Sequence, residues 1–300
     1  MTNADAQRLV VSGTLTLDTT EREGVVHAGV PGGSALYAAA AGSLLVQACI
    51  VGTVGSDFPF EALRTVWERG VQRTAIEVLD GPTFRWHARY QPDGDHRVTV
   101  SRDAGVAAGR LPVVPPMDVT PYALLLGSTD PRVQAHVRDV CATARLVGLD
   151  SMAHWWTERP DALRALLGRV DVVFVDDAEL ALATGATDRL AGARQLLALG
   201  PGVVVVKAGS RGAWMVRRDR EPISTSAVVL PGVTDPTGAG DAFAGAFIAA
   251  LARRAERGDE HALRFATASA SFAVEGVGTS GLVRADLAGI QRRMDALGAS

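Results

Sequence analysis

Short, continuous apolar runs recur along the chain and alternate with segments of helical periodicity. The run Val203-Val204-Val205-Val206 consists entirely of β-branched residues and shows no alternation between apolar and polar side chains. A strand of this kind suits a sheet that is covered on both faces, because neither of its own faces is solvated. Alternation of such strands with helices over 300 residues predicts an α/β fold with a mostly parallel central sheet.

The expected elements follow from these patterns. The strands are predicted at Arg8–Ser12, Ala48–Val54, Ala123–Gly127, Arg145–Asp150, Val170–Val175 and Val203–Lys207. The helices are predicted at Ser34–Leu45, Phe58–Arg69, Arg132–Thr143, Asp161–Leu167 and Leu190–Leu199. No internal repeat or low-complexity linker divides the chain, so we expect one domain over residues 1–300.

Two segments interrupt the strand–helix alternation. Thr83–Tyr90 and His96–Ser101 flank a turn at Gln91–Asp95 that contains Pro-Asp-Gly, which predicts a β-hairpin. Thr14–Asp18 and Val25–Val30 flank a polar turn and predict a second hairpin. We expect both to form a small β-layer, made of about residues 14–30 and 83–102 and suited to act as a lid.

Composition limits the classes of partner. Thirty Lys and Arg against 33 Asp and Glu give a net charge of −3, without the basic excess that a nucleic-acid binder usually shows. Cys49 and Cys141 lie far apart in apolar contexts, so neither a disulfide framework nor a cysteine metal site is expected. Residues 28–56 carry no charge, but their Gly, Ala and Pro residues favour a buried helix and strand over a membrane span. Met1–Gln7 lacks the pattern of a secretory signal, and we expect a cytoplasmic protein.

Polar residues follow four of the predicted strands. Ser128-Thr129-Asp130, Asp150-Ser151, Asp176–Glu179 and Lys207–Gly212 each come directly after an apolar run. In open α/β sheets, ligands bind at the carboxyl ends of the strands. Any one of these residues taken alone is better explained as a helix cap or an ordinary polar loop residue. Their repetition along one expected edge favours a binding cleft.

The segment Asp235-Pro236-Thr237-Gly238-Ala239-Gly240-Asp241 precedes the apolar run Ala242–Ile248. Pro and Gly predict a turn, and the apolar run predicts a buried helix. Small residues at 238–240 leave the amides of the first turn uncovered, at the positive end of the helix dipole, where an anion binds. A carboxylate at Asp241 would accept a proton from an attacking hydroxyl while those amides hold a phosphoryl group. The alternative is a helix start that Asp241 merely caps.

This segment resembles the C-terminal signature of the ribokinase/PfkB family of carbohydrate and nucleoside kinases, which usually reads Asp-Thr-Thr-Gly-Ala-Gly-Asp. Pro236 is a common variant of the first Thr. Gly32-Gly33 before an Ala-rich helix and Val51–Asp57 after it are similar to the family's N-terminal signature, and Gly70-Val71 fits the Gly-Val pair that follows. The resemblance extends over nearly the whole chain. It implies a three-layer α/β/α ribokinase-like fold with a small β lid.

The resemblance also implies roles for individual residues, with ATP and Mg²⁺ as the cofactors. It implies Asp241 as the base; Gly238, Ala239 and Gly240 as the anion hole; Gly209, Ser210 and Gly212 as the nucleotide loop; Asp176 and Glu179 as the residues that organise magnesium through water; Asp18, Gly32 and Gly33 as substrate contacts; and Asp235 and Thr237 as a candidate site for a monovalent cation such as K⁺. A homodimer through the lid is expected from the exposed strand edges.

Three positions need separate comment. Asp176 stands where the family usually has Asn, and an added carboxylate would either hold magnesium more directly or repel the triphosphate. Tyr37 stands where many sugar kinases have a substrate-contacting Asn, so it either stacks on a substrate ring or packs. Lys207 is the chain's single lysine, and a compact ammonium at a strand end suits contact with nucleotide phosphate, the alternative being a solvated loop residue.

These observations predict an ATP-dependent phosphotransferase that acts on a hydroxyl of a sugar or cyclitol-like molecule. A nucleoside kinase is one alternative, favoured by the aromatic residues Tyr37, Phe84 and Trp86. The other is a ligand-binding or regulatory protein that keeps the fold without catalysis, which Asp176 leaves open.

Overall fold

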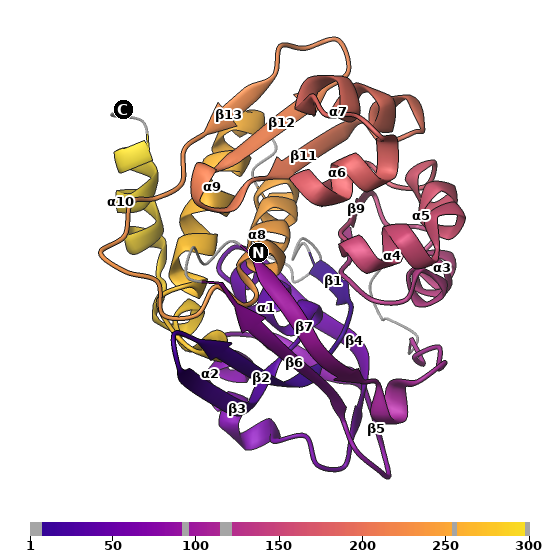
Figure 1. Ribbon diagram of the computed structural model, residues 1–300, viewed down its shortest axis with the longest axis vertical. Coiled ribbons are helices and arrows are strands. Elements are labelled where there is room, and N and C mark those ends of the chain that lie inside the picture. Colours follow the sequence, from indigo (N-terminus) through magenta and orange to yellow (C-terminus); the bar gives the residue numbers. More distant parts are fainter. Residues whose placement is uncertain (1–7, 92–95, 115–121, 254–256, 298–300) are drawn as a thin grey trace, which may run out of the picture.

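The structure is a computed structural model that describes residues 8–91, 96–114, 122–253 and 257–297. Within these ranges the chain forms a nine-stranded sheet and a separate four-stranded sheet (Figure 1). Met1–Gln7 and residues 92–95 of the expected hairpin turn lie outside the described residues.

The large sheet has the order β13-β12-β11-β10-β9-β8-β1-β4-β5. Its strands are β1 (Arg8–Ser12), β4 (Gln47–Gly55), β5 (Val71–Leu79), β8 (Ala123–Leu126), β9 (Leu146–Leu149), β10 (Val172–Asp176), β11 (Val203–Lys207), β12 (Ala213–Arg217) and β13 (Ile223–Thr225). All neighbours are parallel except where β12 pairs with β11 and with β13. The chain fills one side of β1 with β4 and β5 and then returns to its other side with β8. Ligands of open α/β sheets bind at such a reversal of strand order.

Each central strand divides its side chains between two cores. Val203 and Val205 lie in one apolar cluster, whereas Val204 and Val206 lie in the other. The first core is covered by α1 (Ser34–Gly42), α2 (Arg64–Glu68), α8 (Ala239–Arg253), α9 (Gly258–Ala273) and α10 (Leu287–Leu297). The second is covered by α3 (Pro131–Val140), α4 (Ala153–Glu158), α5 (Pro160–Leu167), α6 (Asp177–Thr184) and α7 (Arg189–Ala198). These layers confirm the three-layer α/β/α fold (Figure 1).

Small residues bring α1 and α8 into close contact at the centre of the first core. A Cβ on Gly245 would lie 2.1 Å from the carbonyl oxygen of Ala38, and one on Gly42 would lie 3.3 Å from the carbonyl oxygen of Gly245. The alanine-rich sequence of α1 is therefore a requirement of packing, since larger side chains would push α8 away from the sheet. This contact places the first turn of α8 beside the carboxyl end of β1.

The small sheet has the order β3-β2-β6-β7, formed by β2 (Thr16–Arg22), β3 (Val25–Gly32), β6 (Phe84–Tyr90) and β7 (Arg97–Asp103). Both expected hairpins are present, and β2 pairs with β6 in parallel. Phe84, Trp86 and Tyr90 face the large sheet, as the alternation along β6 predicts. The outward side chains of β6 form ion pairs instead: Arg85 with Asp57, and His87 and Arg89 with Glu21.

All six predicted strands are confirmed with bounds that differ by at most two residues. The expected helix Phe58–Arg69 is split into a 3-10 turn at Phe60–Leu63 followed by α2. The sequence analysis did not assign β5, β12, β13, α4, α6, α9 or α10. Within the described ranges, no helix is both long and apolar enough to cross a membrane, and residues 28–56 form β3 in part, then α1 and β4.

Candidate active site

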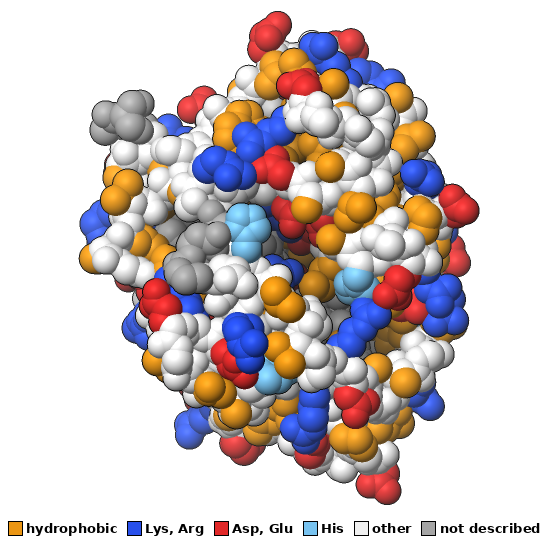
Figure 2. Space-filling view, viewed as in Figure 1, with side chains coloured by type: hydrophobic (Ala, Val, Ile, Leu, Met, Phe, Trp, Pro, Cys, Tyr) orange, Lys and Arg blue, Asp and Glu red, His pale blue; other side chains and the backbone are white. Residues whose placement is uncertain are grey.

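A cleft of about 1540 Å³ lies between the small sheet and the carboxyl ends of the large sheet's strands. Ser128 after β8, Asp150 after β9, Asp176 at the end of β10 and Lys207 at the end of β11 all line it. The face shown in Figure 2 is hollowed at this place, with acidic side chains inside the hollow. The four strand ends that the sequence analysis singled out therefore meet in one cavity.

The turn before α8 is held open at Gly238. This glycine has a φ of 78°, and a Cβ on it would lie 2.2 Å from the ring of Tyr37. The side chain of Asp235 fixes the turn, because Oδ1 accepts a hydrogen bond from the amide of Thr237 at 2.9 Å. Glycine is required at 238 by both the positive φ and the contact with the ring.

The amides of the first turn of α8 face the cleft with little protein around them. Ala239 donates to the carbonyl of Pro236 at 3.3 Å, whereas within the described residues the amides of Gly240 and Asp241 form no backbone hydrogen bond to another residue. Unpaired amides at a helix N-terminus favour an anion. Of the expected anion hole at Gly238, Ala239 and Gly240, only the amide of Ala239 is engaged by the backbone of the described residues, so those of Gly238 and Gly240 are left open to a ligand.

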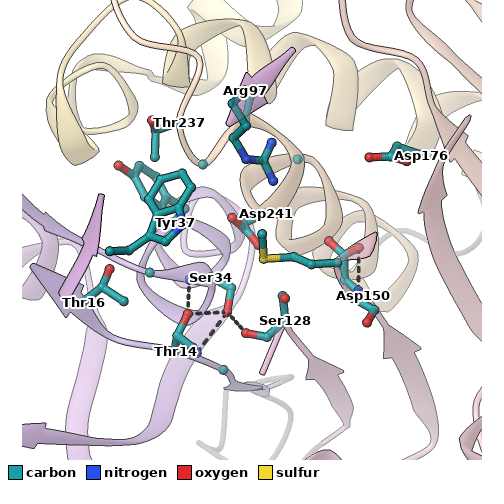
Figure 3. A pocket seen from close by; sticks show the side chains of 18 of the residues that line it. Thr14, Thr16, Ser34, Tyr37, Arg97, Ser128, Asp150, Asp176, Thr237 and Asp241 are labelled. Carbon is teal, nitrogen blue, oxygen red and sulfur yellow. Dashed lines mark hydrogen bonds between the residues drawn. The ribbon is translucent and has the colours of Figure 1, made fainter. Parts of the chain in front are cut away.

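Asp241 lies in this first turn and faces the cleft (Figure 3). Burial raises the pKa of its carboxyl group to about 7, and the negative charge of Asp150 acts in the same direction. The positive charges of Lys207 and Arg97 partly oppose that rise in pKa. A carboxylate with a pKa near neutrality is suited to accept a proton from a hydroxyl group.

Lys207 forms a buried ion pair that the sequence analysis did not assign. Its Nζ donates to both carboxylate oxygens of Asp150 at 2.7 Å. The same Nζ lies 3.3 Å from the position that a Cβ on Gly240 would occupy. The solvated-loop alternative is wrong, because the side chain of Lys207 is only 16% exposed. Its ammonium instead stands beside the first turn of α8. The signal that could have pointed to this pair is that Lys207 is the chain's single lysine, because a buried ammonium group needs a carboxylate partner.

Asp176 and Glu179 hold each other at the start of α6. Asp176 Oδ1 accepts from the amide of Glu179 at 2.8 Å, and Glu179 Oε2 accepts from the amide of Asp176 at 2.8 Å, which completes a capping box. Asp and Asn are equally good at the N-cap, so Asp176 fulfils the structural part of the role expected of Asn. Burial, followed by the charge of Asp176, raises the pKa of Glu179 well above its ordinary value.

The fit of Mg²⁺ to this place can be judged from the oxygens that remain. The described residues contain no group of three or more His, Cys, Asp or Glu arranged to hold a metal ion. Asp176 and Glu179 each use one carboxylate oxygen in the cap and keep the other. Mg²⁺ usually retains several waters and binds through one or two carboxylates together with phosphate oxygens. The donor set fits magnesium held through water.

The glycine loop forms a 3-10 turn at Gly209–Arg211 on the cleft wall. Gly209 and Gly212 have φ values of 54° and 88°, and a Cβ on Gly212 would lie 2.0 Å from the carbonyl oxygen of Thr225. Arg211 is fixed to Asp177 at 2.7 Å, and Asp177 also binds Arg189. The loop is therefore held between α6 and the start of β12, with Ser210 on the cleft wall.

The opposite end of the cleft contains Asp18, which lies within β2, the strand that follows β1. Asp18 is 3% exposed, and its Oδ1 has no hydrogen-bond partner among the described residues. Its Oδ2 would lie 2.1 Å from a Cβ on Gly32. Burial raises the pKa of Asp18 to about 7, and the charges of Asp235 and Asp241 add to that effect. An orphaned buried carboxylate oxygen that lines a cleft is suited to accept from ligand hydroxyls.

A cluster of hydroxyl groups beneath this end was not predicted. Ser34 Oγ donates to the carbonyl of Ser128 at 2.8 Å, and the Ser34 amide donates to Thr14 Oγ1 at 3.1 Å (Figure 3). Gly33, with a φ of 100°, is the N-cap of α1, and a Cβ there would lie 2.4 Å from the carbonyl of Thr14. Gly33 and Ser34 therefore form a tight floor at the junction of β1, β8 and α1.

Tyr37 lines the cleft, but its side chain is almost completely buried. Its side chain is 2% exposed and packs under Gly238, and burial raises its pKa well above the ordinary value. Of the two expectations for Tyr37, the structure favours packing over stacking on a substrate ring. Phe84, Trp86 and Trp155 also line the cleft.

Asp235 and Thr237 connect the turn to the small sheet. Thr20 of β2 donates to Asp235 Oδ2 at 3.1 Å, and the hydroxyl of Tyr90 in β6 pairs with that of Thr237 at 2.9 Å. Arg22 also donates to the carbonyl of Val233. A monovalent cation at Asp235 and Thr237 would have to share oxygens that protein donors already engage.

Comparisons with known proteins agree with this geometry. The family described as pfkB family carbohydrate kinase matches residues 118–285. The cytidine kinase of Thermococcus kodakarensis is 27% identical over 249 residues, which are 82% of this chain and 88% of that protein. The nucleoside kinase of Methanothermobacter thermautotrophicus is 29% identical over 255 residues, covering 83% of this chain and 79% of that protein.

Solved structures show the same fold. Arabidopsis thaliana ribokinase, complexed with ribose and ATP, superposes with a TM-score of 0.75 at 23% identity and covers 96% of this chain and 99% of its own. Burkholderia thailandensis nucleoside kinase, in complex with inosine, gives 0.76 at 19% identity and covers 97% and 99%. The family match spans more than half of the chain and includes the turn and first helical turn described above. The chain therefore belongs to the pfkB family of carbohydrate kinases and is a small-molecule kinase.

Proposed function

We propose that this protein transfers the γ-phosphoryl group of ATP to a hydroxyl group of a sugar or cyclitol-like molecule, with Asp241 as the base. One observation carries the proposal. Asp241 has its pKa raised to about 7 in the same helical turn that offers the amides of Gly240 and Asp241 to an anion. A proton acceptor and an anion site that are one residue apart are what transfer of a phosphoryl group to an alcohol requires.

The acceptor would lie between the small sheet and the floor at Gly32 and Gly33. The orphaned oxygen of Asp18 accepts hydrogen bonds from its hydroxyl groups. Asp241 takes the proton of the reacting hydroxyl as its oxygen forms a bond to the γ-phosphorus. The bond from that phosphorus to the bridging oxygen breaks, and its electron pair leaves with ADP. The proton on Asp241 then passes to water, so the net products are ADP, a phosphate ester and H⁺.

The nucleotide would lie along Gly209–Gly212, with its phosphates between Lys207 and the first turn of α8. Mg²⁺, held through water by Asp176 and Glu179, supplies charge neutralisation of the phosphate oxygens. Lys207 remains paired with Asp150, which keeps its ammonium in place near the anion site. The replacement of the family's usual Asn by Asp176 was the reason to consider a non-catalytic protein. Because Asp176 caps α6 as Asn would, this replacement no longer favours that alternative.

The small sheet is proposed to be the lid of this cleft, formed by Thr16–Arg22, Val25–Gly32, Phe84–Tyr90 and Arg97–Asp103. Its inner face carries Asp18, Trp86 and Tyr90, all of which line the cleft. Closing such a layer over the acceptor excludes water, which would otherwise compete with the acceptor for the phosphoryl group. A homodimer through the lid, and activation by K⁺ at Asp235 and Thr237, are further parts of the proposal.

A nucleoside is the second candidate acceptor. The matches to a cytidine kinase and a nucleoside kinase over four-fifths of the chain favour it. Phe84, Trp86 and Trp155 line the cleft and offer faces on which a base would stack.

The test is ATP consumption with a panel of acceptors: ribose, fructose, myo-inositol, cytidine and inosine. We expect turnover with one chemical class, and Asp241→Asn should reduce kcat by roughly 10³-fold or more while MgATP binding, measured by calorimetry, changes little. Near-normal turnover in Asp241→Asn would remove Asp241 from its assigned role. Saturable binding of an acceptor without any turnover by the natural protein would contradict the proposed function as a whole.

A further inference from the structure

The cationic side chains of the cleft differ in how they are paired. Six Arg and Lys side chains line the cleft, and five form ion pairs with carboxylates of the same region. The five paired residues are Arg102, Arg110, Arg132, Lys207 and Arg211. Arg97 is the sixth, and it has no carboxylate partner in the part of the chain that the structure describes.

Arg97 lies at the start of β7, where it is directly opposite Tyr90 of β6. Figure 3 shows its guanidinium extending from the end of that strand toward Asp241. The guanidinium stands over the indole of Trp86, 5.7 Å from the ring centroid. The indole is itself fixed, since its N–H donates to the hydroxyl of Thr99 in β7 at 3.3 Å. Stacking on a held aromatic ring orients the planar guanidinium at little loss of conformational entropy.

The positive charge of Arg97 lies on the side of Asp241 toward which the phosphoryl group would move. Lys207 stands on the nucleotide side of Asp241, and Asp150 already balances its charge. During transfer, the phosphoryl group moves away from ADP toward the acceptor, which lies on the side of the small sheet. Negative charge therefore moves away from Lys207 and toward Arg97. A cation that meets this charge, and that no carboxylate of the described residues neutralises, stabilises the transition state more than the bound ATP.

We propose that Arg97 is a catalytic residue that binds the phosphoryl group during its transfer from ATP to the acceptor. The inference rests on the proposed function. Arg97 donates hydrogen bonds to the equatorial oxygens of the phosphoryl group while Asp241 holds the proton of the acceptor. The bonds made and broken are those of the transfer itself, and Arg97 neither gains nor loses a proton. Since Arg97 belongs to the proposed lid, this contact forms only when the small sheet lies over the site.

The experiment compares Arg97→Ala, Arg97→Lys and the control Arg89→Ala, using whichever of ribose, myo-inositol and cytidine the natural protein phosphorylates. Arg89 lies on the outer face of the adjacent strand, paired with Glu21. We expect Arg97→Ala to lower kcat by about 10²- to 10³-fold with little change in either KM. Arg97→Lys should retain more activity than the alanine variant, and added guanidinium chloride at millimolar concentration should restore part of the activity of Arg97→Ala alone. Arg89→Ala should keep its kcat.

A binding measurement separates a catalytic contact from a merely structural one. Calorimetric titration of MgADP with and without aluminium fluoride, a mimic of the transferring phosphoryl group, should show tighter binding with fluoride in the natural protein. Arg97→Ala should lose that tightening while its affinity for MgADP alone stays within about twofold. Equal tightening in both proteins would overturn the proposal. An unchanged kcat in Arg97→Ala would also overturn the proposal. A rise in the KM of the acceptor alone would overturn it too, because Arg97 would then bind an anionic substituent of the acceptor. If the natural protein phosphorylates no acceptor of the larger panel, the proposed function fails and not this inference alone.

Discussion

At the level of single side chains, the cleft is organised by carboxyl groups that the fold keeps partly protonated at neutral pH. Asp18 and Asp241 both have their pKa raised to about 7, chiefly by burial. Burial also raises the pKa of Asp150, and its ion pair with Lys207 opposes that rise. The sequence predicted Asp241 and Asp18 through their motifs. It offered no pattern for Arg97, because the role proposed for this arginine depends on which side chains surround it in space.

The raised pKa of Asp241 predicts a pH dependence of turnover. A protonated Asp241 cannot accept the proton of the acceptor, so kcat should fall about tenfold per pH unit below pH 7 and level off above it. The value of kcat/KM reports the ionisation of groups in the free enzyme. Because Asp18 and Asp241 both titrate near pH 7 there, kcat/KM should fall more steeply than kcat as the pH drops below 7. Asp18→Asn should remove the additional slope. A kcat that is flat from pH 5 to 8 would contradict the assignment of Asp241 as base.

The same pKa shift carries a prediction for stability. The folded protein keeps the proton of Asp241 up to about pH 7, whereas the unfolded chain loses it near its ordinary pKa of 3.8. The stability contribution of this group is therefore full below about pH 4 and is lost as pH rises through 7. Asp241→Asn, which removes the buried negative charge, should raise the melting temperature at pH 8 more than at pH 5. A lower melting temperature at pH 8 would show that the ionised carboxylate is stabilised by its surroundings.

Among the helices and strands, α6 and β5 show why parts of the fold were not predicted from the sequence. Asp176-Asp177-Ala178-Glu179 resembles a metal motif, and the capping box that begins α6 uses the same residues. A helix cap was considered there only as an alternative, and the helix itself was not assigned. β5 carries an exposed Arg73 and a half-buried Glu77 because it is an edge strand, and its mixed pattern does not resemble the apolar central strands. The strands of the small sheet were predicted because their polar turns and alternation are local signals.

The hydrogen bonds between the small sheet and the turn before α8 predict that the two act together. Tyr90→Phe removes the bond to the hydroxyl of Thr237 and leaves that buried group unpaired. We expect a loss of about 1–3 kcal/mol in the free energy of unfolding. We also expect a roughly tenfold fall in kcat, since the turn that positions Asp241 would be less firmly held.

Tyr122→Phe is the matched control for that experiment. Tyr122 directly precedes β8, at the end of the sheet opposite the cleft, and stacks with Arg145. Its replacement should leave kcat unchanged. If Tyr90→Phe lowers stability but not kcat, the bond to Thr237 is structural and does not position the catalytic turn.

For the whole molecule, the small sheet leaves two strand edges, β3 and β7, without a partner in the described structure. Val26 and Val98 on these strands are 57% and 56% exposed. Exposed edges and apolar side chains invite pairing with another copy of the sheet. We expect sedimentation analysis at micromolar concentration to show a dimer, and Val26→Glu with Val98→Glu to weaken it by at least tenfold in Kd through buried charge. A natural protein that stays monomeric at 100 times the assay concentration would contradict the dimer.

The local pattern of residues along the chain was enough to predict the α/β class, the central strands, the two hairpins and the turn that precedes α8. Each of these depends on neighbours within a few residues, which is the range over which periodicity and turn chemistry act. The partners in the cleft required the tertiary structure, because Lys207 and Asp150 are 57 positions apart and Thr20 and Asp235 are 215 apart. Which strand ends meet depends on β1 lying between β4 and β8 and on the close contact of α1 with α8. The motif at Asp235–Asp241 thus predicted the chemistry. The packing of distant elements supplied the buried Asp150–Lys207 pair beside it and Arg97, which has no carboxylate partner among the described residues.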